Sequence, residues 1–161
     1  MRVNDLQNGF SLVELLVVVA IIGILMAIAV PNILASRRAA NEGSALSAMR
    51  TIHSAQVTYL NTQGAGNYGT LTNLKNENLV DATLGGGSKS GYTFDCPAGN
   101  ITAGPPPTYF ATAVPADTAA WTRTGTRSFT IAEDGIVRGK VSDTGAANHA
   151  AATTSATWPP L

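Results

Sequence analysis

The sequence predicts an α+β fold, in which one long N-terminal helix packs its second half against a small antiparallel sheet of three or four strands. Two patterns carry this prediction. Residues 10–30 are almost entirely apolar, and the apolar residues of the next 30 or so positions recur at helical spacing. The second half of the chain instead contains short strand-like runs, separated by glycine, proline and polar residues.

The composition fits one domain joined to an apolar segment. Only 12% of the residues are charged, and ten basic residues balance ten acidic ones, so the totals suggest no electrostatic attraction to nucleic acid or to an acidic membrane face. The single cysteine, Cys96, excludes an intrachain disulfide. An exported domain of this chain would therefore have to hold together by packing alone.

Residues 10–30 are long enough to cross a membrane once. As a helix they would span roughly 31 Å, close to the ~30 Å thickness of the bilayer hydrocarbon. Glu14 is the one charge in this run, and an ionised carboxylate in lipid costs about 2.5–3.5 kcal/mol. It is expected either to reach back to the headgroups or to meet a cation, and a cut just before Phe10 would create an amine one helical turn away.

The helix is predicted to continue over residues 32–62, where Gly43 is the one helix breaker. One face of this amphipathic half is formed by Leu46, Met49, Ile52 and Tyr59. Residues 63–91 contain seven glycines and predict an irregular connection that holds one helical turn. Within it, residues 85–90 superficially resemble a phosphate-binding loop, but they lack its first glycine, so a flexible linker is predicted there.

Residues 92–141 predict the sheet. The strand-like runs are residues 92–95, 109–114, 128–132 and 136–141. The last two are joined by Glu133-Asp134-Gly135, which is a strong hairpin signal, and the three prolines at 105–107 require a turn between the first two. Residues 142–161 are rich in Ala, Thr and Ser without periodicity and predict a flexible or loosely docked tail.

No catalytic, cofactor or metal site is predicted. His53 and His149 each lack a second ligand at metal spacing, so both are expected to be surface residues. The acidic pair at 133–134 fits turn chemistry better than a carboxylate dyad. Asp95, next to Cys96, has no basic partner in sequence that would activate a nucleophile.

Residues 8–15 read Asn-Gly-Phe-Ser-Leu-Val-Glu-Leu and lead through the apolar run to Pro31-Asn32. This pattern resembles the type III signal sequence of type IV pilins and type II secretion pseudopilins. It combines a short polar leader, glycine immediately before phenylalanine, glutamate at the fifth mature position, one span and a proline near its end. The resemblance covers about the first 60 residues and implies a pilin-like fold and a structural, non-enzymatic subunit.

The resemblance also implies a processing and assembly route. A prepilin peptidase would remove residues 1–9 by cutting between Gly9 and Phe10, and would methylate the new amine of Phe10. Glu14 would pair with the Phe10 amine of a neighbouring subunit. The stretch from Gly23 to Pro31 would unwind in the filament, in agreement with the N–H that proline lacks and with the low helix propensity of glycine.

The family orientation places the N-terminus of a single-pass inner-membrane precursor in the cytoplasm and the later filament outside the cell. The implied partners are prepilin peptidase, identical or related pilin subunits, a pilus assembly platform protein, an assembly ATPase, a secretin and inner-membrane lipid. A positive-inside count would favour the opposite orientation, because Arg37, Arg38 and Arg50 follow the span while the leader has Arg2 against Asp5. The cleavage motif is more specific than this count, so the family orientation is preferred.

Three functions remain open. The first is a structural subunit of a type IV pilus, with motility, adhesion or DNA uptake as downstream roles. The second is a pseudopilin of a type II secretion system; major pseudopilins carry a Tyr-Pro segment and a C-terminal calcium loop, whereas this chain has Asn67-Tyr68-Gly69 and no clustered carboxylates in residues 142–161. The third is a membrane-tethered binding protein, which would tolerate Glu14→Ala.

Overall fold

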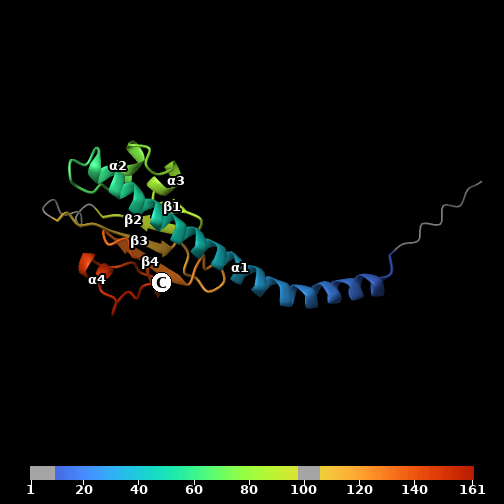
Figure 1. The fold of residues 1–161 in the computed structure, drawn as a ribbon. Helices are drawn as coiled ribbons and strands as arrows, with labels where there is room; N and C mark the ends of the chain where they lie inside the picture. The colour runs from blue at the N-terminus through green and yellow to red at the C-terminus, as the bar shows by residue number, and fades with distance from the viewer. Residues whose placement is uncertain (1–9, 98–105) are drawn as a thin grey trace, which may run out of the picture. The chain divides into compact units, whose positions relative to one another are not determined.

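The computed structural model describes residues 10–97 and 106–161 and shows an α+β fold (Figure 1). The elements in chain order are helices α1 (Leu12–Asn61), α2 (Leu71–Asn76) and α3 (Ala82–Gly85), strands β1 (Ser88–Lys89), β2 (Tyr92–Asp95), β3 (Phe110–Pro115), β4 (Arg127–Ala132) and β5 (Arg138–Val141), and helix α4 (His149–Thr153). The chain divides into two compact units, one ending at Ser36 and one beginning at Arg37. The predicted fold class is confirmed.

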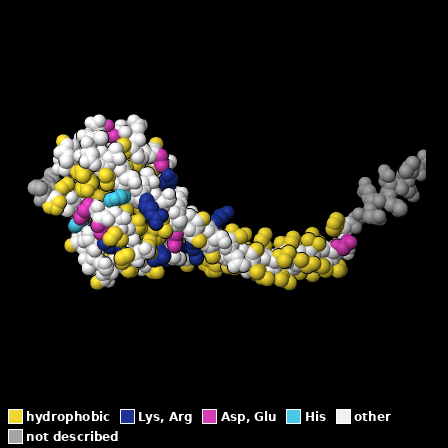
Figure 2. Space-filling model, in the orientation of Figure 1, with side chains coloured by type: hydrophobic (Ala, Val, Ile, Leu, Met, Phe, Trp, Pro, Cys, Tyr) yellow, Lys and Arg dark blue, Asp and Glu magenta, His cyan; other side chains and the backbone are white. Residues whose placement is uncertain are grey.

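The N-terminal unit contains the first half of α1 and leaves its apolar side chains exposed. Among the large apolar residues of positions 10–30, exposure ranges from 45% for Val30 to 86% for Phe10. Figure 2 shows a nearly continuous hydrophobic surface along this helix, with acidic atoms at its start. The most apolar window of α1 has a mean hydropathy of 3.0 with none of it buried, so by length and composition this helix can cross a membrane.

The main core of the C-terminal unit lies between α1 and the sheet, and a smaller cluster of Phe110, Ala132 and Ala152 joins the sheet to α4. The predicted face of the helix is confirmed, because Met49 and Ile52 are fully buried and Leu46 and Tyr59 pack against the core as partly buried residues. From the sheet, the aromatic and aliphatic side chains that complete the core include Tyr92, Phe94, Phe129 and Ile131. Figure 1 shows α1 running across one face of the strands in this unit.

The sheet is antiparallel throughout, in the order β1-β2-β3-β4-β5. It has five strands, whereas three or four are predicted. The additional strand is β1, because residues 85–90, which are predicted to be a flexible linker, take part in a tight hairpin. Gly91 has a φ of +72° and Ser90 a φ of +49°, which reverses the chain between β1 and β2. Ser88 thereby pairs with Thr93, and Lys89 pairs with Tyr92.

The connection after α1 contains two short helices, α2 and α3, whereas the sequence predicts an irregular connection with one helical turn. Thr70 and Asn73 form a capping box that begins α2, and the Asp81 side chain accepts the Leu84 N–H to begin α3. Apolar side chains of this segment enter the core, and Leu74 and Leu84 are fully buried. Local capping therefore shapes a region whose glycine content predicts only an irregular loop.

The predicted hairpin between β4 and β5 is present, with Thr130 paired to Arg138. Gly135 has a φ of +70°, and the Asp134 carboxylate accepts the Ile136 N–H at 3.0 Å. Arg138 is only 4% exposed, and its guanidinium donates a hydrogen bond to the Asp134 carboxylate at 2.6 Å. The bond to Ile136 is the turn chemistry that the sequence predicts, and the pairing of Asp134 with the buried Arg138 is an additional role. The three prolines predicted to separate β2 from β3 begin at residue 105, outside the described residues.

We expect Asp134→Asn to lower the free energy of unfolding at pH 7 by about 1–3 kcal/mol, because it weakens a hydrogen bond to a buried charge. Burial raises the pKa of Asp134, but the Arg138 hydrogen bond, the Ile136 N–H and the Arg138 charge together hold it below its ordinary value. A lowered pKa stabilises the fold above the ordinary aspartate pKa of about 4 and loses this contribution as the pH falls through the folded value. Urea unfolding of the full chain in detergent at pH 7 and pH 3 should show the smaller pH effect in Asp134→Asn; an equal effect would contradict this role.

Residues 142–161 are docked on the rest of the unit, which is the second of the two predicted alternatives, a flexible or a loosely docked tail. The Asn148 side chain caps α4 by accepting the Ala151 N–H at 2.8 Å, and Trp158 is 2% exposed. The backbone N–H of Gly139 donates to Pro159 at 3.0 Å, and the N–H of Leu161 donates to Val137 at 3.2 Å, so the end of the chain runs along β5. Backbone bonds and one large aromatic side chain hold this segment, and neither produces a periodic sequence pattern.

Candidate functional site

The start of α1 is a capping box built from Ser11 and Glu14. The Ser11 hydroxyl accepts the Val13 N–H at 3.3 Å, and the Glu14 carboxylate accepts the Ser11 N–H at 3.0 Å. These bonds satisfy two of the four N–H groups that a helix leaves free at its start, and the negative charge interacts favourably with the helix dipole. Glu14 therefore has a partner within its own chain. The spacing Ser11-x-x-Glu14 is the local sequence signal for this cap.

Phe10 lies just ahead of this cap. Its side chain is 86% exposed, and the helix begins two residues later at Leu12. Gly9, the other residue of the predicted cleavage site, lies outside the described residues. The structure thus places Phe10 in non-helical chain next to the capped helix, and cleavage and methylation at this position remain predictions.

An apolar groove lies beside the cap and is lined by Leu12, Leu15, Leu16 and Val19. It is shallow and open, and it is formed by one face of α1 within the N-terminal unit. Glu14 occupies the same turns of the helix as these four residues. At about 100° per residue, Glu14 lies roughly 150° around the helix axis from the middle of this groove, so the carboxylate and the groove face different neighbours.

Gly23 and Pro31, the predicted limits of a stretch that unwinds, both lie inside continuous α1. A Cβ added to Gly23 would meet no atom within 4 Å, so packing within this chain does not require glycine there. Close by, the Asn32 amide donates to the Ile28 carbonyl at 3.1 Å. The stretch is helical in the described structure, and its unwinding remains a prediction.

The two histidines are predicted to be surface residues, but in the structure both are half-buried and hydrogen-bonded. A hydrogen bond of 2.8 Å joins His53 Nδ1 to the Tyr109 hydroxyl, and His149 Nε2 lies 2.7 Å from the Glu133 carboxylate. Both imidazoles are half-buried and hold separate elements together, which the sequence could not show because their partners are distant in the chain. Over residues 10–97 and 106–161, no group of three or more His, Cys, Asp or Glu could hold a metal ion.

Cys96 is buried with Gln56 in the core. Gln56 is fully buried, and its amide donates to the Gly69 carbonyl and to the Cys96 sulfur, the latter at 3.3 Å. Burial raises the pKa of the thiol to about 12, which outweighs the opposing effect of the Gln56 hydrogen bond. The thiol therefore stays protonated, and Asp95 beside it cannot act as its base.

We expect native Cys96 to react with iodoacetamide at pH 8 at least about 100-fold more slowly than in the denatured chain, because both access and the thiolate fraction are low. Mass spectrometry of chain labelled with and without guanidinium chloride measures the ratio. The lone thiol makes the readout unambiguous. Comparable labelling in the two states would show that the core around Gln56 opens readily.

Comparisons with known proteins agree with the sequence motif. Residues 4–30 match the family described as the prokaryotic N-terminal methylation motif. The type IV major pilin protein PilA of Myxococcus xanthus is 40% identical over 58 residues, covering 36% of this chain and 26% of that protein. The type II secretion system core protein G of Escherichia coli is 37% identical over 59 residues, covering 37% and 41%.

A third relative, the type IV wide pilus major component PilA4 of Thermus thermophilus, is 59% identical over 35 residues, which is 22% of this chain and 27% of that protein. The matches therefore span between 26% and 41% of the length of these relatives. No solved structure matches the chain. The chain thus carries the N-terminal methylation motif at residues 4–30, and over at most 37% of its length it is similar to type IV pilins and type II secretion pseudopilins.

Proposed function

We propose that this chain is a structural subunit of a type IV pilus, made as an inner-membrane precursor and polymerised into an extracellular filament. Prepilin peptidase removes residues 1–9 and methylates the amine of Phe10. The observation that carries the proposal is the exposed apolar first half of α1, which begins at one capped carboxylate. A helix that is apolar on all sides needs either lipid or other helices around it. Insertion and polymerisation supply these two environments in turn.

The capped carboxylate can take part in assembly without losing its helix contact. One oxygen of Glu14 accepts the Ser11 N–H, and among the described residues its other oxygen accepts no hydrogen bond. That oxygen can meet the Phe10 ammonium of the next subunit, while apolar side chains enter the groove at Leu12 and Leu16. The contact joins two different surfaces, so its repetition builds a helical fibre wherever the rotation from one subunit to the next does not close a ring.

Assembly of this kind requires the machinery that the family uses: a platform protein, an assembly ATPase and a secretin. The membrane-inserted subunit also contacts inner-membrane lipid along α1. Motility, adhesion and DNA uptake are uses of the finished filament, and the globular unit would present its surface for them. We propose no enzymatic activity for the chain. The Cys96 thiol is buried in the core, and His53 and His149 are hydrogen-bonded to Tyr109 and Glu133 between elements of the fold.

A second candidate function is that of a type II secretion pseudopilin, and the 37% identity to core protein G of Escherichia coli favours it. Both candidates require cleavage before Phe10 and assembly through α1. They differ in where the assembled subunit is found, because a pseudopilin would form a short periplasmic filament and a pilin a surface fibre. The location of the processed chain therefore separates them.

Intact mass spectrometry of material sheared from cells tests the proposal. The expected result is a chain that starts at N-methylated Phe10, found in the sheared fibres and missing from them in a strain without prepilin peptidase. The same processed chain confined to the cell envelope would favour the pseudopilin. A chain that keeps Met1 and remains entirely in the membrane would overturn both functions.

A further inference from the structure

The loop between β3 and β4, residues 116–126, exposes a tryptophan that the fold does not use. Trp121 is 83% exposed, whereas Trp158, the other tryptophan, is 2% exposed. Tryptophan is a costly residue to leave in water, and it is enriched where one side of a ring meets apolar material and the other meets polar groups. The 116–126 loop is therefore a candidate contact surface.

This loop is held in place by α1. Arg38 donates to the carbonyl of Ala120 and to the carbonyl of Arg123, both at 3.2 Å, so it holds the chain on either side of Trp121. Asn41 donates to the carbonyl of Thr124 at 2.8 Å. Trp121 is thus exposed on a loop that hydrogen bonds from Arg38 and Asn41 attach to α1.

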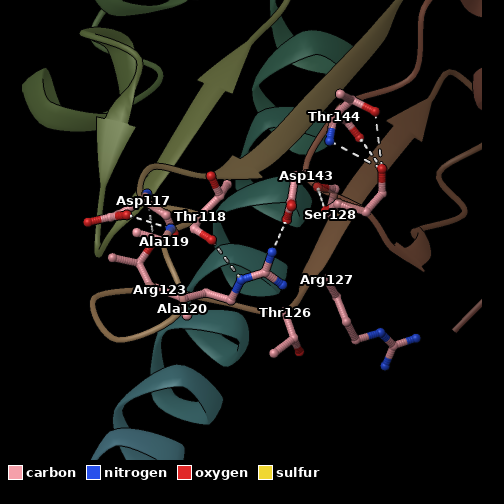
Figure 3. A network of polar contacts seen from close by, with 12 residues as sticks. Asp117, Thr118, Ala119, Ala120, Arg123, Thr126, Arg127, Ser128, Asp143 and Thr144 are labelled. Atoms are coloured by element: carbon pink, nitrogen blue, oxygen red, sulfur yellow. Dashed lines mark hydrogen bonds and ion pairs between the residues drawn. The ribbon is translucent and has the colours of Figure 1, made fainter.

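The acidic groups around the loop form hydrogen bonds or an ion pair, whereas two cations on the adjoining elements α1 and β4 form no ion pair among the described residues (Figure 3). Glu42 accepts the N–H of Thr126 at 2.8 Å, Asp117 accepts that of Ala119 at 2.9 Å, and Asp143 pairs with Arg123. In the part of the chain that the structure describes, the guanidinium groups of Arg37 and Arg127 form no ion pair, and Arg37 is exposed. Figure 3 shows the Arg127 side chain extending away from the hydrogen-bonded network.

The position of Arg38 in the sequence relates this surface to the bilayer. Arg38 follows Val30, the end of the apolar run, by only eight positions in the sequence. The headgroup layer on each side of the hydrocarbon is roughly 5–8 Å thick. Arginine side chains at this position can reach phosphates, and tryptophan at headgroup depth is the arrangement typical of membrane interfaces.

We propose that Trp121, together with Arg37 and Arg127, docks on anionic phospholipid headgroups of the membrane in which α1 is inserted. The inference rests on the membrane insertion in the proposed function. Arg37 and Arg127 contact the phosphates, and the indole lies among the headgroups. The net charge of zero conceals this surface, because the carboxylates nearby accept backbone N–H groups or pair with Arg123. The contact holds the globular unit at the membrane before assembly and is released when the subunit enters the filament.

The test uses the full chain in vesicles that contain phosphatidylglycerol and bromine-labelled phosphatidylcholine, which quenches tryptophan on contact. Trp158→Phe leaves Trp121 as the reporter, and Trp121→Phe leaves Trp158 as the matched control. We expect Trp121 emission to be quenched at least about twofold more strongly than Trp158 emission. Arg37→Gln combined with Arg127→Gln, or vesicles of phosphatidylcholine alone, should remove most of this difference. If Trp158→Phe does not fold, subtracting the emission of Trp121→Phe from that of the wild type gives the emission of Trp121.

Flotation of the vesicles separates the two levels of the proposal. Equal quenching of the two tryptophans in chain that floats with the vesicles would overturn the docking and leave membrane insertion standing. Chain that does not float would overturn the insertion on which both depend. Protection of Trp121 in filaments without quenching in vesicles would assign the loop to a contact between subunits and overturn the lipid proposal.

Discussion

A Glu14→Gln subunit is expected to reach the membrane and yet to form no filaments. Glutamine at this position can still accept the Ser11 N–H, so the helix keeps its cap. It cannot balance the Phe10 ammonium of the next subunit, and an unpaired charge buried among apolar helices costs about 3–5 kcal/mol. That is more than about 100-fold in the equilibrium of each addition step. Immunoblots of the sheared and membrane fractions measure the loss.

Ser11→Ala is the matched control that the capping box provides. It removes the hydroxyl that accepts the Val13 N–H, at a cost of about 1 kcal/mol to the helix start, and it keeps the carboxylate. We expect this variant to assemble nearly as well as the wild type. If Ser11→Ala fails as completely as Glu14→Gln, or if Glu14→Gln assembles normally, then Glu14 acts only as a cap and the proposed ion pair is wrong.

Trp158→Ala is expected to destabilise the globular unit by about 3–5 kcal/mol, the typical cost of truncating a large buried aromatic side chain. The ring is 2% exposed, and Lys140 lies 5.5 Å above it in a cation–π contact. Its loss should also release the strand-like pairing of the chain end with β5. Urea unfolding of the full chain in detergent, followed by circular dichroism, measures the first effect, and limited proteolysis within residues 142–161 measures the second.

The exposed Trp121 provides the control for this measurement. Trp121→Ala makes the same chemical change at a side chain that is 83% exposed, so it should alter the free energy of unfolding by less than about 0.5 kcal/mol. Similar losses in the two variants would show that residues 142–161 do not contribute to the core. An unchanged proteolysis pattern in Trp158→Ala would show that backbone pairing alone holds the chain end.

Features that depend on neighbouring residues could be read directly from the sequence. The apolar run, the helical spacing of Met49 and Ile52 and the glycine turn at Gly135 are local patterns, and the structure has α1, the buried face and the hairpin where these patterns predict them. The motif around Phe10 and Glu14 is local as well, which is why it identifies the family in so short a stretch. The capping role of Glu14 was equally local, in the Ser-x-x-Glu spacing.

Other features were decided by the tertiary structure alone. Arg38 and the carbonyls that it holds beside Trp121 are 82 and 85 positions apart in the sequence, and His53 lies 56 positions from Tyr109. Docking of residues 142–161 depends on backbone bonds to β5, which any residue type could form. Such contacts leave no periodic pattern, because the residues that meet are set by the path of the chain. The sequence by itself therefore determined the long helix, four of the five strands and the similarity to pilins and pseudopilins. The three-dimensional fold decided β1, the docking of residues 142–161 and the partners of the arginine and aromatic side chains.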